Sequence, residues 1–445
     1  MNDITRKKPV QAEPDLLQSI TPPVPPMPPE PPRPRPLKAG PFGVLDVGST
    51  KICCLIGRVD SDGVMRVVGS SVQAARGIRA GGIVDLDAAE AAIRRVVAEA
   101  ENQSEIHLRH VTVNLTCGQP ESRLYNVQWP VGGRAVTEQD IRRVLGEGRT
   151  RATLGGRETI HVLPLVFSVD ETPGVPDPRG LHAEQLSAKL HVIDAGATAV
   201  QNMMTTLARC QLDLHELVSA PMAAGLATLV EDERQLGATV IDMGGGTTGM
   251  AVFSEGQLLH TAYLPVGGGH VTNDIARILS TPVTHAERLK TLYGNAEGCP
   301  DDEREMLPVP LVGEEEHQLH RVPRSQIVNI IKPRLEETFE LVRARLDSAG
   351  LAREAGNRVV LTGGASQLSG AREMAARILD RQVRAGKPVH LRGLPDTASG
   401  PAFATAAGLL TWASGAGRRL ADIEMTEEGP DTLLRRVIKF IRDRV

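Results

Sequence analysis

Three short turns that contain glycine, each directly after an apolar stretch, are the residues of this chain best suited to chemistry. They span 48–51, 244–248 and 363–366, and the apolar stretches before them predict buried strands. Glycine lets the backbone approach an anion closely and leaves its N–H groups free to point at that anion. One such turn is weak evidence, since glycine occurs wherever φ must be positive. Three of them, far apart in the chain, predict a site that holds phosphate from more than one side.

Two of the turns follow a strand that carries an aspartate, Asp46 before the first turn and Asp242 before the second. A carboxylate in this place can hold a hydrated divalent cation that bridges phosphate oxygens, and magnesium needs few such groups because it keeps several waters. The alternative is that each carboxylate only caps its own turn. The matching context of the two turns favours the magnesium site. Four side chains add hydrogen-bond donors to the turns: Thr50, Lys51, Thr247 and Thr248.

The stretches around the turns predict the elements that must position them. Residues 42–58 predict a strand bent back at the first turn, and 64–72 predict a further strand. Asp85 can cap a helix that runs to about residue 103, and 110–116 predict another strand. From residue 237 the order of strand, glycine turn and strand begins again. This internal duplication predicts two lobes around a cleft.

An insertion is predicted to interrupt the first lobe between about residues 117 and 194. It contains strand-like stretches over 124–129, 160–169 and 186–193. Thr137 opens a helix there with a Ser/Thr-x-x-acid capping pattern. The insertion is therefore expected to form a small α+β subdomain.

Composition excludes several classes of function. The chain has 445 residues, enough for more than one core. Its net charge of −4 and aromatic content of 2 % argue against nucleic-acid binding. No uninterrupted apolar stretch of about 18–20 residues predicts a membrane span, and the N-terminus lacks the apolar core of a secretion signal. The five cysteines form no Cys-x-x-Cys pair and predict reduced thiols that fill apolar space in a cytosolic protein.

The three turns resemble the two phosphate motifs and the adenosine motif of the actin, Hsp70 and sugar-kinase superfamily. Within it the chain is similar to the FtsA family of bacterial cell-division proteins, also over RGIRAGGIVD at 76–85 and TNDIA at 272–276. The resemblance runs from about Phe42 to the last residue. It implies an α/β, actin-like, two-lobed fold built from duplicated ribonuclease-H-like domains around a nucleotide cleft. The insertion then corresponds to the subdomain called 1C.

The resemblance implies ATP and Mg²⁺ as ligands, with the magnesium held through water by Asp46 and Asp242. Glu287 and Lys290 would face the ribose and adenine, although their spacing alone fits a solvated helix face equally well. Relatives place a glutamate where this chain has Ala220, so we expect weak hydrolysis at most and a bound nucleotide that acts as a conformational signal. The residues implied to bind the nucleotide are Gly48, Ser49, Thr50, Lys51, Gly244, Gly245, Gly246, Thr247, Glu287, Lys290, Gly363, Gly364 and Ser366.

A basic amphipathic helix is predicted over 431–445, after a Gly-rich, charged stretch over 414–430 that predicts a flexible linker. Such a helix is typical of segments that lie flat in an anionic membrane interface. The resemblance to the FtsA family, whose members end in a membrane-targeting helix, implies the same role here. The alternative is a helix packed on its own domain. Membrane contacts are predicted for Leu433, Leu434, Arg435, Arg436, Val437, Ile438, Lys439, Phe440, Ile441 and Arg442.

The predicted division of the chain begins with a proline-rich tail, which favours polyproline II and cannot build a packed core. The tail is expected to be a solvated spacer, or else a binding motif for a partner. The predicted parts are the tail over 1–41, lobe 1A over 42–116 and 195–234, subdomain 1C over 117–194, lobe 2A over 235–270 and 326–413, subdomain 2B over 271–325, the linker over 414–430 and the terminal helix over 431–445.

The function implied by the resemblance is that of an ATP-binding adaptor at the cytoplasmic face of the inner membrane. It would polymerise, tether filaments of the tubulin-like protein FtsZ to the membrane, contact other division proteins through 1C and help assemble the division ring. The C-terminal peptide of FtsZ is expected on 2B, with Arg321, Arg324 and Arg334 as candidate partners for its acidic groups. Two alternatives are a pilus-assembly protein of the PilM type and a small-molecule kinase of the same superfamily. The terminal helix argues against both, because neither normally carries such an anchor.

Overall fold

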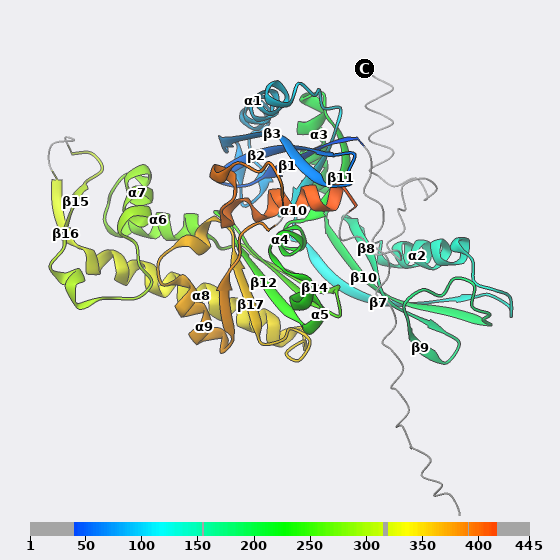
Figure 1. The fold of residues 1–445 in the computed structure, drawn as a ribbon. Coiled ribbons are helices and arrows are strands. Elements are labelled where there is room, and N and C mark those ends of the chain that lie inside the picture. The colour runs from blue at the N-terminus through cyan, green and yellow to red at the C-terminus, as the bar shows by residue number, and fades with distance from the viewer. Residues whose placement is uncertain (1–39, 154, 315–318, 390, 416–445) are drawn as a thin grey trace, which may run out of the picture. The chain divides into compact units, whose positions relative to one another are not determined.

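The protein is described by a computed structural model over residues 40–153, 155–314, 319–389 and 391–415. Two five-stranded sheets of mixed direction form the centre of this part of the chain (Figure 1). The first sheet has, from edge to edge, β11 (Asp213–Ser219), β6 (His110–Leu115), β1 (Pro41–Val47), β2 (Lys51–Val59) and β3 (Met65–Ala74). The second has β14 (Gln257–Leu264), β13 (Thr248–Ser254), β12 (Ala238–Met243), β17 (Arg358–Thr362) and β18 (Gln382–Ala385).

The two sheets repeat one pattern of strand pairing. In the first, β1 and β2 and then β2 and β3 are antiparallel, whereas β6 lies parallel to both β1 and β11. In the second, β12 and β13 and then β13 and β14 are antiparallel, whereas β17 lies parallel to both β12 and β18. This repeated pairing confirms the predicted internal duplication and the α/β character of the two lobes.

Helices cover the first sheet through an apolar core that includes Ile93, Val96, Val200 and Met203. The helix predicted after Asp85 is present, and the Asp85 carboxylate accepts hydrogen bonds from the first-turn N–H groups, both at 3.1 Å. Two short strands lie between β3 and the first helix. These elements are β4 (Ile78–Arg79), β5 (Gly82–Ile83), α1 (Leu86–Ser104) and α3 (Ala197–Arg209).

Two helices, α4 (Ala220–Thr228) and α10 (Ala404–Ala413), pack against each other within a core that takes side chains from both sheets (Figure 1). Their backbones come close together at Gly408. A Cβ built there would lie 1.7 Å from the carbonyl oxygen of Ala223, so only glycine fits this crossing. The two lobes are therefore joined by the packing of α4 against α10, which leaves no room for a side chain at Gly408.

The second sheet is covered by helices whose apolar side chains share one core with its strands. The chain between two of these helices contains a short antiparallel hairpin, which the sequence analysis did not predict. The elements of this lobe are α5 (Glu231–Leu236), α6 (Gly268–Ile278), α7 (Val283–Tyr293), η1 (Pro300–Glu303), β15 (Met306–Pro310), β16 (Leu319–Pro323), α8 (Arg324–Ser348), η2 (Gly364–Gln367), α9 (Ala371–Leu379), η3 (Asp396–Ala398) and η4 (Pro401–Phe403).

The insertion forms a separate four-stranded sheet of order β7-β10-β8-β9, packed against one helix. Thr137 and Asp140 make the predicted capping box at the start of that helix. The elements are β7 (Glu121–Pro130), α2 (Glu138–Ala152), β8 (Arg157–Val169), β9 (Thr172–Val175) and β10 (Gln185–Gly196). The predicted α+β character of the insertion is thus present.

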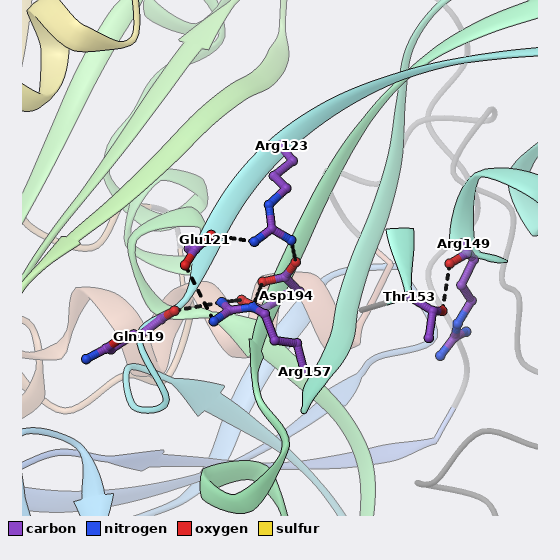
Figure 2. Close-up of polar contacts among 7 residues, drawn as sticks. All are labelled: Gln119, Glu121, Arg123, Arg149, Thr153, Arg157 and Asp194. Carbon is purple, nitrogen blue, oxygen red and sulfur yellow. Dashed lines mark hydrogen bonds and ion pairs between the residues drawn. The ribbon is translucent and has the colours of Figure 1, made fainter. Parts of the chain in front are cut away.

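A charged cluster holds together the two places where the chain enters and leaves the inserted sheet, as Figure 2 shows. The carboxylate of Asp194 is 2 % exposed and accepts from the guanidinium groups of Arg123 and Arg157. Arg157 also donates to the carbonyl oxygen of Gln119 at 2.8 Å, and Glu121 lies against both arginines. Removing one partner of a buried ion pair leaves an uncompensated charge, which is strongly destabilising. The cluster is therefore expected to hold together the strand ends at which the chain enters and leaves the inserted sheet.

Four of the five cysteines are buried apolar fillers, as predicted: Cys53, Cys54, Cys117 and Cys210. Burial raises the pKa of the Cys53 thiol to about 12 and that of Cys210 to about 11. Cys299 departs from the prediction, because it is exposed next to η1. Within the described residues, no helix is long and apolar enough to cross a membrane.

Candidate functional site

A cavity of about 710 Å³ lies where the glycine turns of the two sheets face each other. Its volume is in the range of pockets that hold small molecules and cofactors. The structure brings together there every residue predicted for the nucleotide and magnesium except Ser366. The predicted residues that line it are Asp46, Gly48, Ser49, Thr50, Lys51, Asp242, Gly244, Gly245, Gly246, Thr247, Glu287, Lys290, Gly363 and Gly364.

Two predicted donors point elsewhere. The hydroxyl of Ser366 donates to the carbonyl oxygen of Gly363 at 2.7 Å and so closes its own turn. The hydroxyl of Thr248 is buried and donates to the carbonyl oxygen of Val266 at 2.8 Å. Both side chains therefore stabilise the loops around the cavity and do not line it.

The first two glycine turns have the same closing hydrogen bond. The N–H of Gly48 donates to the carbonyl of Lys51 at 3.0 Å, and the N–H of Gly244 donates to that of Thr247 at 2.9 Å. The turns also come very close to each other. A Cβ at Gly245 would lie 1.9 Å from the Thr50 hydroxyl oxygen, so a side chain there would displace the Thr50 side chain of the facing turn.

Asp46 is buried at the end of β1, and its carboxylate is oriented by a neighbouring strand. The side-chain amide of Asn114 on β6 donates to it at 2.8 Å, while the Lys51 ammonium lies 3.5 Å from its other oxygen. Burial raises the pKa of Asp46, and the Lys51 charge partly opposes that rise. The carboxylate is thus held in one orientation at the wall of the cavity.

Asp242 occupies the equivalent position in the second sheet, at the end of β12. It is half-buried, and the hydroxyl of Thr405 on α10 donates to it at 2.8 Å. Burial raises the pKa of Asp242 to about 6, and the negative charge of Asp46 adds to the rise. A carboxylate whose pKa is raised further by a second carboxylate at the same cavity favours a cation between the two.

The N-terminus of α6 opens into the cavity at a run of glycines, which lie at 267–269. The N–H groups of Gly268 and Gly269 donate to the carbonyl oxygens of Gly244 and Gly245, at 3.0 Å and 2.7 Å, and so fix the second turn against the helix. The dipole of the helix makes this end attractive to anions. Further along, the ammonium of Lys290 donates to Glu287 at 2.7 Å and to the Thr272 hydroxyl at 2.9 Å. These two residues thus form an ion pair at the cavity wall, and their contacts with the ribose and adenine stay a prediction.

Sequence reasoning missed Asn114, Thr405 and the glycines at 267–269. Asn114 had a weak signal, since it is a polar residue near the end of an otherwise apolar strand. Thr405 had none, because it sits in an apolar helix far from the turns in sequence. Ala220 lines the cavity and offers no acidic side chain there.

The three arginines predicted for a partner peptide do not form one free basic patch. Arg334 is paired with Asp274, at 2.6 Å and 3.2 Å, and also with Glu337. Arg324 is paired with two acidic residues and its side chain reaches the cavity wall. Arg321 is exposed on β16. The predicted membrane-binding residues lie outside the described residues.

The raised pKa of Asp242 predicts that the site binds Mg²⁺ less tightly in acid. A cation needs the ionised carboxylate, and below the folded pKa of about 6 a proton must leave first. We therefore expect apparent affinity for Mg·ATP to fall about fourfold, beyond any change in ATP itself, between about pH 7.5 and about pH 5.5. The folding stability of the ligand-free protein depends on pH with the opposite sign. The raised pKa of Asp242 favours the protonated acid in the folded state, so the contribution of Asp242 to stability declines as pH rises from about 4 to 6.

Titration calorimetry across this pH range, with Asp242→Asn as the control for protonation of ATP, checks this expectation. Thr405→Val removes the hydrogen bond that lowers the Asp242 pKa, so it should move the midpoint to higher pH. Equal pH dependence in the unmodified protein and in Asp242→Asn would contradict the assignment.

Solved structures with the same arrangement show to which class this fold belongs. A structure of the PilM–PilN type IV pilus biogenesis complex superposes with a TM-score of 0.60 at 18 % identity, covering 86 % of this chain and 99 % of the other. MreB5 of Spiroplasma citri bound to ADP superposes with a TM-score of 0.52 at 14 % identity, covering 85 % and 97 %. The fold, with its two-sided glycine cavity, is that of the actin-like proteins.

Sequence comparison then gives the family. The model of the cell division protein FtsA matches residues 239–408, and the model of the SHS2 domain inserted in FtsA matches residues 118–194. FtsA of Agrobacterium fabrum is 41 % identical over 86 % of this chain and 88 % of its own length. FtsA of Rhizobium meliloti is 40 % identical over 87 % and 89 %. The chain belongs to the FtsA family of cell-division proteins.

Proposed function

We propose that the chain binds ATP with Mg²⁺ in the cavity between the two glycine turns. The observation that carries this proposal is the pair of matching turns from the two sheets, each with a carboxylate at the end of the strand before it. One turn would hold the β- and γ-phosphates from the first lobe and the other from the second, while the dipole of α6 adds a favourable field at its N-terminus. Gly363 and Gly364 would lie against the adenosine, with Glu287 and Lys290 at the ribose and adenine.

The donor set fits magnesium. Oxygen ligands suit this cation, and it keeps most of its waters, so Asp46 and Asp242 would hold it through water. The cation would neutralise phosphate charge. It would also offset the repulsion from Asp46, which adds to the effect of burial in raising the pKa of Asp242. Because Ala220 offers no group to position a water, we expect slow hydrolysis and a nucleotide that acts as a conformational signal.

In this proposal the protein is an adaptor of the division ring. It polymerises at the cytoplasmic face of the inner membrane, binds anionic lipid through the helix that the sequence predicts at 431–445 and tethers FtsZ by its C-terminal peptide. Other division proteins would contact subdomain 1C, and the predicted division of the chain into 1A, 1C, 2A and 2B stands as part of the proposal. Of the three candidate arginines, Arg321 is favoured for the acidic peptide, since Arg324 and Arg334 already pair with carboxylates.

Liposome co-sedimentation of the full chain and of a chain that ends at Gly429 tests the adaptor. With anionic vesicles, we expect only the full chain to pellet, because the truncated chain lacks the predicted basic amphipathic helix. We also expect ATP to change the pelleted fraction of the full chain. Neutral vesicles are the control for electrostatic attraction. Equal sedimentation of both chains would contradict a membrane role for the helix, and indifference to ATP would contradict coupling to the cavity.

A further inference from the structure

Tyr263 on β14 reaches from the second lobe to the strand ends of the first. Its side chain lines the cavity, and its hydroxyl lies 2.8 Å from the Ser219 hydroxyl oxygen and 3.3 Å from the carbonyl oxygen of Leu115. Ser219 and Leu115 are the last residues of β11 and β6, and they are register partners in the first sheet. One phenol of the second sheet therefore meets two neighbouring strand ends of the first, at the cavity.

The protons of this contact can be assigned from chemistry. A phenol has one proton, and the carbonyl of Leu115 can only accept, so Tyr263 donates to Leu115 and the Ser219 hydroxyl donates to Tyr263. Burial raises the pKa of Tyr263, which keeps that proton in place at neutral pH. Each hydroxyl then has a partner from the other lobe.

Ser219 is also connected to the inserted sheet. Its backbone N–H donates to Nε2 of His161 on β8 at 3.1 Å, and both residues are buried. The ring of His161 in turn packs edge-on against Trp412 of α10, with ring centroids 5.6 Å apart. The residues directly after Ser219, Ala220 and Pro221, line the cavity. At Ser219 the first lobe, the second lobe and the insertion thus meet within one residue of the cavity wall.

The inserted sheet contacts the same strand of the second lobe through buried polar groups. Nδ1 of His191 on β10 lies 3.0 Å from the carbonyl oxygen of Leu258 on β14, which can only accept. The N–H of Thr261 on β14 donates to the Ser122 hydroxyl on β7 at 3.3 Å. A displacement of β14 relative to the first lobe would therefore act on the insertion as well as on the cavity.

We propose that the hydroxyl pair of Tyr263 and Ser219 is an interlobe latch, which positions the cavity wall and couples it to the inserted sheet. Both are positioning residues, since they act through the backbone at Ala220 and through His161. The first consequence, slower release of nucleotide, rests on the proposed ATP site. The second consequence, protection of the β8 backbone against hydrogen exchange, does not depend on any ligand.

Two variants that each remove one hydroxyl test the latch, Tyr263→Phe and Ser219→Ala, together with the double variant. One hydrogen bond between neutral groups corresponds to a change of about three- to tenfold in rate. We expect release of a fluorescent ATP analogue, measured by stopped flow, to become about three- to tenfold faster in each variant, with association unchanged. The double variant should be no faster than the faster single one, because the two groups form one contact. Tyr125→Phe, on β7 of the insertion, is the matched control and should release at the unmodified rate.

Hydrogen exchange of the nucleotide-free full chain is the second measurement. Peptides from β8 and β14 should exchange faster in Tyr263→Phe and Ser219→Ala, and at the unmodified rate in Tyr125→Phe. If the unmodified protein binds no ATP, the proposed function fails, and this exchange result alone decides the latch. If ATP binds but neither release nor exchange changes in the variants, the latch is overturned and the ATP site stands. Faster release without faster exchange at β8 overturns the coupling to the insertion.

Discussion

Replacing Gly245 by valine is expected to lower ATP affinity by at least about a hundredfold, equivalent to roughly 3 kcal/mol. A Cβ at this position would lie 1.9 Å from the hydroxyl oxygen of Thr50, and that side chain belongs to the facing turn. The Thr50 side chain must then leave its position, and the valine methyl groups occupy the space between the two turns. Because the proposed phosphate contacts depend on both turns at once, the loss should be close to complete. Titration calorimetry with ATP and Mg²⁺ measures it.

The control for this variant is Gly146→Ala. Gly146 lies within α2 of the insertion, and a Cβ built there meets nothing within 4 Å, so the change adds a methyl group without a clash. It should leave ATP affinity unchanged. Gly245→Ala provides an intermediate case, since it adds one carbon and the Thr50 side chain can rotate away. Unchanged affinity in Gly245→Val would refute the two-sided arrangement of the site.

Gly408→Val is expected to destabilise the whole protein, by about 3 kcal/mol or more. A Cβ here would lie 1.7 Å from a backbone oxygen of α4, the carbonyl of Ala223, and a backbone cannot rotate away as a side chain can. Helices α4 and α10 would have to separate inside the core shared by both sheets. We expect a lower midpoint of thermal unfolding, or loss of soluble protein, as the result.

Thermal unfolding followed by circular dichroism measures this effect, with Gly146→Ala again as the matched change inside a helix. The short substitution Gly408→Ala should already lower the midpoint, because its single methyl group carries the clashing Cβ. A Gly408→Val protein that melts like the unmodified chain would mean that the two helices do not cross so closely.

Much of the fold could be predicted because its signals are local. The apolar strands, the glycine turns and the repeated order of elements lie within short windows, and Asp85 and Thr137 act as helix caps within four residues of their own positions. The duplication followed from comparing two such windows. The hairpin of β15 and β16 was missed, since both strands are short, β15 contains Pro308 and Pro310, which argue against a strand, and β16 is largely exposed.

The site was only partly predictable, for a related reason. The glycines make the turns recognisable in the sequence, whereas Asn114 and Thr405 contribute through contacts that span 68 and 163 positions of sequence. Arg334 likewise lies 60 positions from its carboxylate partner Asp274, so this ion pair could not be foreseen. The roles of the lining residues towards ATP stay predictions until binding is measured.

The distribution of the cysteines makes the unmodified chain ready for site-specific labelling. Cys299 is the exposed one of the five, while burial of the others raises the pKa of their thiols, as at Cys53 and Cys210, and shields them from reagents. A maleimide dye should therefore attach beside η1, in the region proposed as subdomain 2B. Such a dye would report on the neighbourhood of Asp302 and its partner Arg324, which reaches the cavity wall. Ligand binding could then be followed by fluorescence without any engineered residue.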